Sequence, residues 1–479
     1  MTTHFMRTHV NATRIIALVA AAASLAACDS KQLDITNPNT PTVAAAAADA
    51  QALQLQAPGL LRQLRNGRGG YIFSMGRFGR EMYIYTPQEG RDTSAYPQGL
   101  TGLNKLDPAG FAVENWGTQY GNLRDIFNFK KTVAGSSVLT AEQKSAANGF
   151  VKTLEGLELL YVISTRDTIG AVVEIKQNAS DLAPFVSRDS VYKYILNTLD
   201  DANTALAGGG AAFPFALHSG FAGFNTPANF AKFNRAIAAR AAAYYATSGG
   251  GAAAWQRSLT ALTVSFMNTA ATSRADLDAG PVQPYSGSTG DTGNPFFNNS
   301  ADLYLHPSTD TDAPLKADGA KDNRYLAKVK AKTTRRPPSG VTGISSSIGW
   351  VGDASISNSV PIIRNEELLL LRAEALLGTG SKQGAIDIIN AIRVNSGGLA
   401  SSTLTTASSD AAVLTELLLQ KRYSTLLEGR RWVDLRRYNL LSTLPLDASN
   451  HFVATVQPLP QGECLVRAGL TGALVGPGC

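Results

Sequence analysis

Four consecutive leucines at 368–371 constrain this chain more than any other feature of its sequence. They belong to a stretch, 361–438, that reads as three helices separated by glycine-containing breaks. A run of four leucines covers most of the circumference of a helix, so little of the first helix can face water. Glu367 and Glu374 are seven residues apart and therefore lie on one face of that helix. The stretch predicts a buried helix inside a larger helical structure.

The break at 378–381 separates the first helix from the second. Gly378 is a typical C-terminal stop, and Ser381 is a typical N-cap. The second helix repeats apolar residues at the i, i+3, i+4, i+7 spacing from Ala385 to Ile392. Two helices joined by a short turn form a helical hairpin, which is the unit of helical-repeat scaffolds.

Helical hairpins are expected at three places, near 140–206, 229–267 and 364–396. Thr140 is a candidate N-cap for the first of them. The second is rich in alanine, which lets neighbouring helices approach closely, as stacked repeats require. The sequence therefore predicts a mostly α fold of TPR-like helical hairpins, in a single domain over 43–479, with long irregular loops and a few short strands.

Two regions lack helical periodicity. Residues 66–111 combine glycines, prolines and aromatic residues, and residues 280–360 combine prolines, serines, glycines and several aspartates. Short strands are expected around 325–329. Because long irregular inserts in packed proteins are often functional, we expect the ligand or partner surface in these two regions.

The amino terminus reads as a targeting segment. Basic residues precede an apolar run, 15–27, which is too short to span a bilayer comfortably. Small residues lead directly to Cys28 and form a lipobox, so we expect a signal peptide over 1–27 and a lipid on the Cys28 thiol. An ordinary secretory signal followed by a chance cysteine is the alternative. The polar residues 28–42 would form the spacer between the lipid and the folded body.

Only Cys464 and Cys479 remain once Cys28 carries a lipid. An even pair of cysteines outside the cytoplasm predicts a disulfide that closes the C-terminal tail. Two free thiols are the alternative.

The chain lacks the usual signs of catalysis and of nucleic-acid binding. Its net charge of +6 is spread out, with no basic arm. His218, His306 and His451 are isolated from one another, so no zinc motif is present. The sequence has no G-x-S-x-G elbow, P-loop or dinucleotide fingerprint. We expect no catalytic residue, cofactor or metal, although a carboxylate pair for glycoside hydrolysis would leave no local trace.

Aromatic residues outside the expected helices are the best indication of a ligand. Sugars present flat C–H faces that stack on aromatic rings, together with hydroxyls that need polar partners. Each such ring taken alone is more often part of a core. The candidates for ligand contact are Tyr71, Phe73, Tyr83, Tyr85, Tyr96 and Trp350.

Three segments carry a resemblance to a known family. In order they read RNEELLLLRAEALL at 364–377, AIDIINAIR at 385–393 and LEGRRWVDLRRYNLL at 427–441. Together they resemble the C-terminal signature of the RagB/SusD family, whose members are nutrient-capturing lipoproteins of the bacterial outer membrane.

The resemblance implies a SusD-like helical superhelix and a lipid-anchored place at the outer membrane, on the cell surface. It also implies a TonB-dependent, SusC-like transporter as partner and an oligosaccharide or peptide as ligand. Arg431 and Asp434, three residues apart on one helix, could pair, and the resemblance gives them a structural role. We also expect Glu367 and Glu374 to be structural. A secreted glycan hydrolase on a helical scaffold, or a repeat scaffold without a small ligand, remains the alternative.

Overall fold

The computed structural model describes residues 43–86, 90, 94–100, 102–178, 180–335 and 345–479. The expected signal peptide, Cys28 and the spacer lie outside these residues. Within them the protein is mostly helical, as the sequence predicts, with short strands between the helices. No helix in the described part of the chain is long and apolar enough to cross a membrane.

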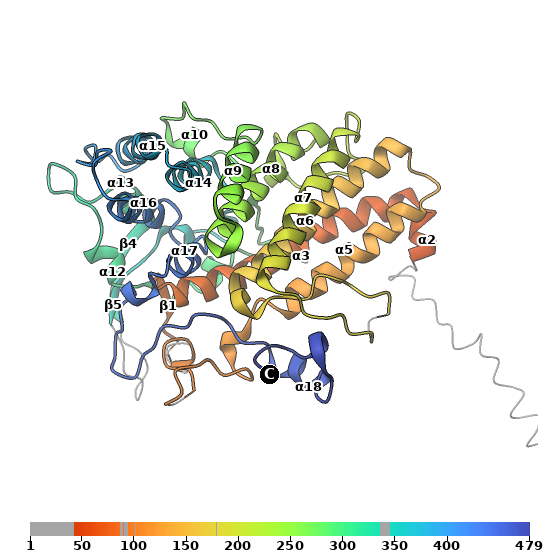
Figure 1. Ribbon diagram of the computed structural model, residues 1–479, viewed down its shortest axis with the longest axis horizontal. Coiled ribbons are helices and arrows are strands. Elements are labelled where there is room, and N and C mark those ends of the chain that lie inside the picture. Colours follow the sequence, from red (N-terminus) through yellow and green to blue (C-terminus); the bar gives the residue numbers. More distant parts are fainter. Residues whose placement is uncertain (1–42, 87–89, 91–93, 101, 179, 336–344) are drawn as a thin grey trace, which may run out of the picture.

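Helices from residues 43–263 lie side by side in the centre and right-hand part of Figure 1. Their bounds are α2 Val43–Ala47, α3 Ala50–Phe78, α5 Gly117–Gly135, α6 Ala141–Arg166, α7 Arg188–Ala207, α8 Pro227–Tyr245 and α9 Gly251–Thr263. They include two of the three hairpins expected from the sequence, α6–α7 and α8–α9.

The α6–α7 hairpin shows how the sequence sets the packing. Thr140 caps α6 with a reciprocal capping box, because its hydroxyl accepts from the Gln143 N–H while the Gln143 side chain accepts from the Thr140 N–H. Gly149 faces α7 so closely that a Cβ there would lie 2.5 Å from Leu206 Cγ. The glycine therefore lets the two helices pack at short range.

The third expected hairpin and the helices after it are seen nearly end-on at the left of Figure 1. They are α14 Asn365–Gly378, α15 Lys382–Asn395, α16 Asp410–Ser424 and α17 Arg431–Arg437. The leucine run at 368–371 is buried throughout, at 5% exposure or less. Ser381 stands at the N-cap of α15, but its side chain makes no capping hydrogen bond.

Short elements connect the two groups of helices. They are β1 Met82–Ile84, α10 Arg274–Asp278, β2 Val282–Gln283, α11 Pro295–Asn298, β3 Leu303–Leu305, α12 Ser308–Thr311, α13 Asn323–Lys328, β4 Val329–Arg335, β5 Ser346–Trp350, β6 Val360–Pro361 and α18 Gln461–Val466. The strands form three antiparallel pairs, β1 with β3, β2 with β6 and β4 with β5.

Two expectations about the loops need correction. Residues 66–78 belong to the helix α3 rather than to a loop, because their small residues pack against other parts of the chain. Gly69 is one example, since a Cβ there would lie 2.9 Å from Pro295 Cβ. The strand expected around 325–329 begins only at Val329, after the short helix α13.

The C-terminal tail folds back onto the helical body. Cys464 and Cys479 form a disulfide, with their Cα atoms 5.4 Å apart. Arg467, inside the disulfide loop, donates to the Ala183 and Leu474 carbonyls and lies over the Phe185 ring. The tail is therefore attached to the body by polar contacts as well as closed on itself by the disulfide.

Candidate ligand-binding site

Four of the six candidate aromatic residues lie in the core. Tyr71, Tyr83, Tyr85 and Tyr96 are each exposed by 2% or less. Tyr71 sits on α3, and its hydroxyl donates to the Gly429 carbonyl. Rings without solvent contact cannot stack on a soluble ligand, so the structure corrects the prediction for these four tyrosines.

The other two candidates are brought together by a residue that the sequence did not single out. Phe296 lies between Phe73 and Trp350, with ring centroids 5.3 Å from Phe73 and 6.1 Å from Trp350. Phe296 is buried, whereas Phe73 and Trp350 are half-buried. The Asn-Pro-Phe-Phe-Asn run at 294–298, in the irregular region, is the signal that could have pointed to Phe296.

Trp350 and Phe296 line a cavity of about 310 Å³, here called the tryptophan cleft. Its lining combines apolar side chains with a polar part of amides, a hydroxyl and charged groups, here called the rim. The other lining residues are Asp278, Asn294, Ala327, Lys328, Val351, Gly352, Asn358, Ser359, Val360, Pro361, Arg364, Leu427 and Glu428. An aromatic wall with a few polar groups is the usual composition of a small-molecule site.

Internal hydrogen bonds fix the rim of the tryptophan cleft. The Asn294 side-chain amide donates to the Asn358 carbonyl at 2.6 Å, and the Asn358 amide donates to the Gly352 carbonyl at 3.2 Å. Gly352 also supports Trp350, because a Cβ at this glycine would lie 2.1 Å from the indole Nε1. The indole is thus held in place before any ligand arrives.

Lys328 brings a cation to the tryptophan cleft. Its ammonium donates to the Tyr423 and Ser424 carbonyls at 2.8 and 2.6 Å, which leaves one of its three N–H donors unused by them. Burial, together with the nearby charge of Arg364, lowers the pKa of Lys328 to about 7. The cleft therefore offers a donor whose charge changes near neutral pH.

A buried charge network anchors the helices below the cleft. Glu367 accepts two hydrogen bonds from Arg240, at 2.7 and 2.8 Å, and two from Arg430, at 3.0 and 3.3 Å. Burial alone would raise the pKa of Glu367, but the charges of Arg240 and Arg430 lower it to about 2. Glu374 is held by Lys421 at 2.6 Å and by Arg437. Both acids are structural parts of this network.

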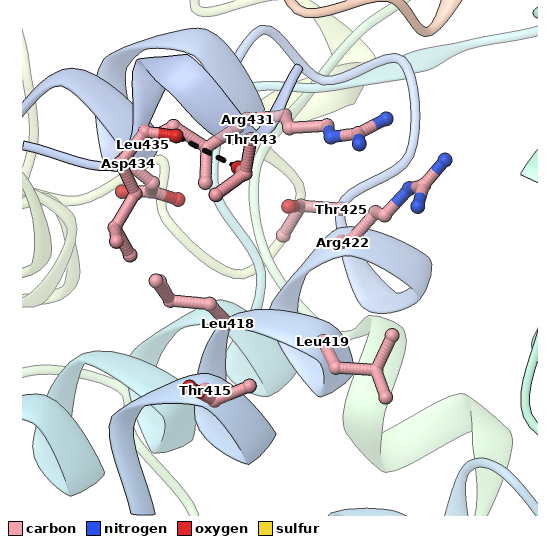
Figure 2. Close-up of a pocket in the computed structure, with 10 residues that line it drawn as sticks. Thr415, Leu418, Leu419, Arg422, Thr425, Arg431, Asp434, Leu435 and Thr443 are labelled. Atoms are coloured by element: carbon pink, nitrogen blue, oxygen red, sulfur yellow. Dashed lines mark hydrogen bonds between the residues drawn. The ribbon is translucent and has the colours of Figure 1, made fainter. Parts of the chain in front are cut away.

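Arg431 and Asp434 do not pair, contrary to what their spacing suggested. Asp434 binds Lys421 at 3.0 Å and Arg437 at 2.9 Å, and Figure 2 shows it turned away from Arg431. Arg431 donates to the Arg80 carbonyl at 3.2 Å. Arg431 and Arg437 are each three residues from Asp434, on opposite sides of it in the sequence. Arg437 also binds Glu374, and it is Arg437 that pairs with the Asp434 carboxylate.

Arg431 and Asp434 instead line a second cavity of about 260 Å³, here called the leucine cavity (Figure 2). It lies between α16, α17 and the short helix η7 Leu441–Thr443. Its lining shares no residue with the tryptophan cleft.

Comparisons with known proteins agree with the mostly helical fold. The SusD family model matches residues 349–461. Among solved structures, a SusD superfamily protein from Bacteroides vulgatus is similar over 88% of this chain and 97% of its own, at 14% identity and a TM-score of 0.63. Residues 349–461 therefore match the SusD family, and the chain as a whole has a SusD-like fold. No curated protein matches its sequence.

Two further SusD-like structures carry descriptions of a ligand. A SusD-like carbohydrate binding protein from Bacteroides fragilis is 13% identical and matches 88% of this chain and 99% of its own, with a TM-score of 0.63. Surface glycan-binding protein A from Bacteroides fluxus is 15% identical and matches 90% of this chain and 100% of its own, with a TM-score of 0.62. At these identities the likeness establishes the shared SusD fold.

The segment matched by the family model contains Trp350, the acids of α14 and the whole lining of the leucine cavity. The helices before it and the residues of α11 lie outside the match. Phe296 and Asn294 thus come to the tryptophan cleft from a part of the chain that the family model does not match.

Proposed function

We propose that this SusD-like protein captures an oligosaccharide at the cell envelope and passes it, without chemical change, to a TonB-dependent outer-membrane transporter. The observation that carries the proposal is the half-buried Trp350 indole, which lies tilted against Phe296 and packs close to Gly352 at the wall of a cleft of about 310 Å³. An aromatic face suits the C–H side of a sugar ring, and the polar rim suits its hydroxyls.

Two similar structures, a SusD-like carbohydrate binding protein and a surface glycan-binding protein, support a glycan rather than a peptide. A stacking site also explains why the rim amides are tied to backbone carbonyls, because a site built before binding loses less entropy on capture. Capture by stacking needs no catalytic residue.

A glycan array followed by calorimetry on the best ligand tests the proposal. Trp350→Ala should weaken glycan binding by roughly tenfold or more, since base–aromatic stacking, the nearest measured case, contributes about 1–3 kcal/mol per ring. Phe111→Ala is the matched control, because Phe111 is an exposed ring, at 48%, that is not part of the cleft. Equal glycan affinity for wild type and Trp350→Ala would contradict the proposed site.

Gly352→Ala tests the position of the indole without removing it. Gly352 does not have a positive φ, so alanine is compatible with its backbone. The new methyl would occupy the place of the Trp350 Nε1 edge and displace the ring. Weaker glycan binding with an unchanged melting temperature is the expected result.

The anchor and the partner are tested separately. Cys28→Ala should abolish incorporation of labelled acyl chains and release the protein from membranes, because a lipidated cysteine is the proposed attachment. Purification of the lipidated protein from its native membrane should co-purify a β-barrel transporter. Hydrolysis of the bound glycan by the purified protein would instead favour a hydrolase.

A further inference from the structure

The leucine cavity has an apolar wall. Four leucines line it, Leu418, Leu419, Leu435 and Leu440. Its three threonine hydroxyls donate to backbone carbonyls, at distances of 2.7 to 2.8 Å, and so are already used as donors: Thr415 to Ala411, Thr425 to Lys421 and Thr443 to Leu440. The walls between α16, α17 and η7 therefore suit a hydrocarbon group.

Two arginines lie at one edge of this apolar wall. Figure 2 shows the guanidinium groups of Arg422 and Arg431 side by side, beyond Thr425. Arg422 binds Asp312 at 2.7 Å and Ser308 at 2.9 Å, and its Nε is buried without a hydrogen-bond partner. Arg431 makes a single hydrogen bond among the described residues, to the Arg80 carbonyl.

The charge of Arg431 is poorly compensated. Burial and the adjacent charge of Arg422 lower the pKa of Arg431 to about 9. Glu81 is the acid that acts most strongly on Arg431, but burial raises the pKa of Glu81 to about 7, and the charges of Arg431 and Arg422 offset only part of that rise. Within the described part of the chain, neither side-chain oxygen of Glu81 has a hydrogen-bond partner. Below that pH the Glu81 carboxyl is mostly protonated, and an external anion would supply the missing charge.

We propose that the leucine cavity binds a small carboxylate with an aliphatic tail. The acid group would accept hydrogen bonds from Arg431 and the free Arg422 Nε, and the tail would lie among the leucines. A cavity of about 260 Å³ has the space of about eight or nine water molecules at roughly 30 Å³ each, which is enough for a medium-length chain. A fatty acid and the C-terminal residue of a peptide share this chemistry.

Calorimetry with octanoate and with N-acetyl-leucine, below the pKa of Glu81, tests the proposal on the whole folded protein. Octanoate represents a free fatty acid and N-acetyl-leucine represents a peptide end. Octanol tests the need for the charge, and acetate tests the need for the tail. We expect at least one of the two carboxylates to bind clearly more tightly than octanol and acetate, and the tighter one identifies the source.

Arg431→Gln should lower carboxylate affinity by about ten- to a hundredfold, the value of one or two hydrogen bonds to a charged group. Arg372→Gln is the matched control, because Arg372 is a half-buried arginine on α14 that lines a different cavity. Leu418→Gln, at a half-buried position on the cavity wall, is the second variant and should weaken octanoate binding even if Arg431→Gln fails to fold.

Three results would overturn the proposal: equal affinity for octanol and octanoate, unchanged carboxylate affinity in Arg431→Gln and Leu418→Gln, or an equal loss in Arg372→Gln. Trp350→Ala should leave carboxylate binding unchanged, because the two cavities share no lining residue. If Trp350→Ala weakens glycan binding but leaves carboxylate binding unchanged, the two proposed sites can be tested independently.

Discussion

Glu158 should make this protein less stable as the pH rises. It lies in the middle of α6 with 2% of its surface exposed, and its described hydrogen bond comes from the Asn122 side-chain amide at 2.6 Å. Burial raises the pKa of Glu158 to about 8, and the Asn122 hydrogen bond offsets only part of this rise. The folded protein therefore keeps a proton here that the unfolded chain has already released.

The sign and size follow from the two pKa values. The unfolded chain releases the proton near 4.5 and the folded protein near 8. Between them the folded state binds more protons, so the free energy of unfolding falls as the pH rises through this interval and is constant above it. At 1.36 kcal/mol per pH unit, the interval of about 3.5 units corresponds to at most about 5 kcal/mol.

Glu158→Gln removes the titration and keeps an acceptor for Asn122. In urea unfolding, the variant should match wild type near about pH 5 and exceed its stability by several kcal/mol near about pH 9. Other titrating groups, such as Glu81, are present in both proteins and cancel in the comparison. A stability difference that does not grow between the two pH values would refute the reasoning.

Glu155→Gln is the matched control for this experiment. Glu155 lies one turn before Glu158 on α6, but its carboxylate accepts from Lys130 Nζ and from the Tyr194 hydroxyl, each at 2.9 Å. The ionised form is therefore the partnered one, and Glu155→Gln should lower stability at both pH values rather than raise it.

Two further predictions concern the buried ion pairs and the tail. Glu367→Gln should lower the free energy of unfolding by about 3–5 kcal/mol, because Arg240 and Arg430 would keep buried charges without their acid; urea unfolding measures this, and a loss below about 1 kcal/mol, as for an exposed pair, would contradict it. Replacing Cys464 and Cys479 by serine should ease local opening of the tail by about 3 kcal/mol, from the loop-entropy relation for a separation of 15 residues. The expected result is faster amide hydrogen exchange confined to the tail, and the wild-type protein with its disulfide reduced should show the same change. Unchanged exchange in the tail would contradict the prediction.

The features that local rules determine could be predicted from the sequence. Helical spacing located the three hairpins, and Thr140 occupies the N-cap that was expected of it. These features depend on residues within a few positions of one another, so no knowledge of distant contacts was needed.

The errors arose where distant contacts decide the structure. The glycines near Gly69 suggested a loop, yet they lie inside α3, and at Gly69 itself a Cβ would lie 2.9 Å from Pro295 Cβ. Glycine serves there for close packing rather than for a turn, and a sequence cannot distinguish these uses without the partner. The pairing of Asp434 failed for a related reason: local spacing allows either Arg431 or Arg437 as partner, and the contacts of Arg437 with Glu374 and of Lys421 with Asp434, which spacing does not show, decide between them.

The two cavities depend on one buried network. Arg364 lines the tryptophan cleft and binds Glu366 at 2.6 Å and Glu428 at 2.7 Å. Asp434 lines the leucine cavity and binds Lys421, and Lys421 also binds Glu374. Both Glu366 and Glu374 belong to α14, the helix with the four leucines.

Two properties of α14 follow from this arrangement. Its apolar side chains bury it, and its acids then hold the walls of both cavities from below. Removing one partner of a buried ion pair lowers the free energy of unfolding by several kcal/mol. A change at Glu366 or Glu374 should therefore weaken the binding of both ligands together. Changes at Trp350 or Leu418, which lie outside the network, should weaken only one ligand each. Binding measured for both ligands in the same variants therefore distinguishes a residue that contacts a ligand from one that positions the wall.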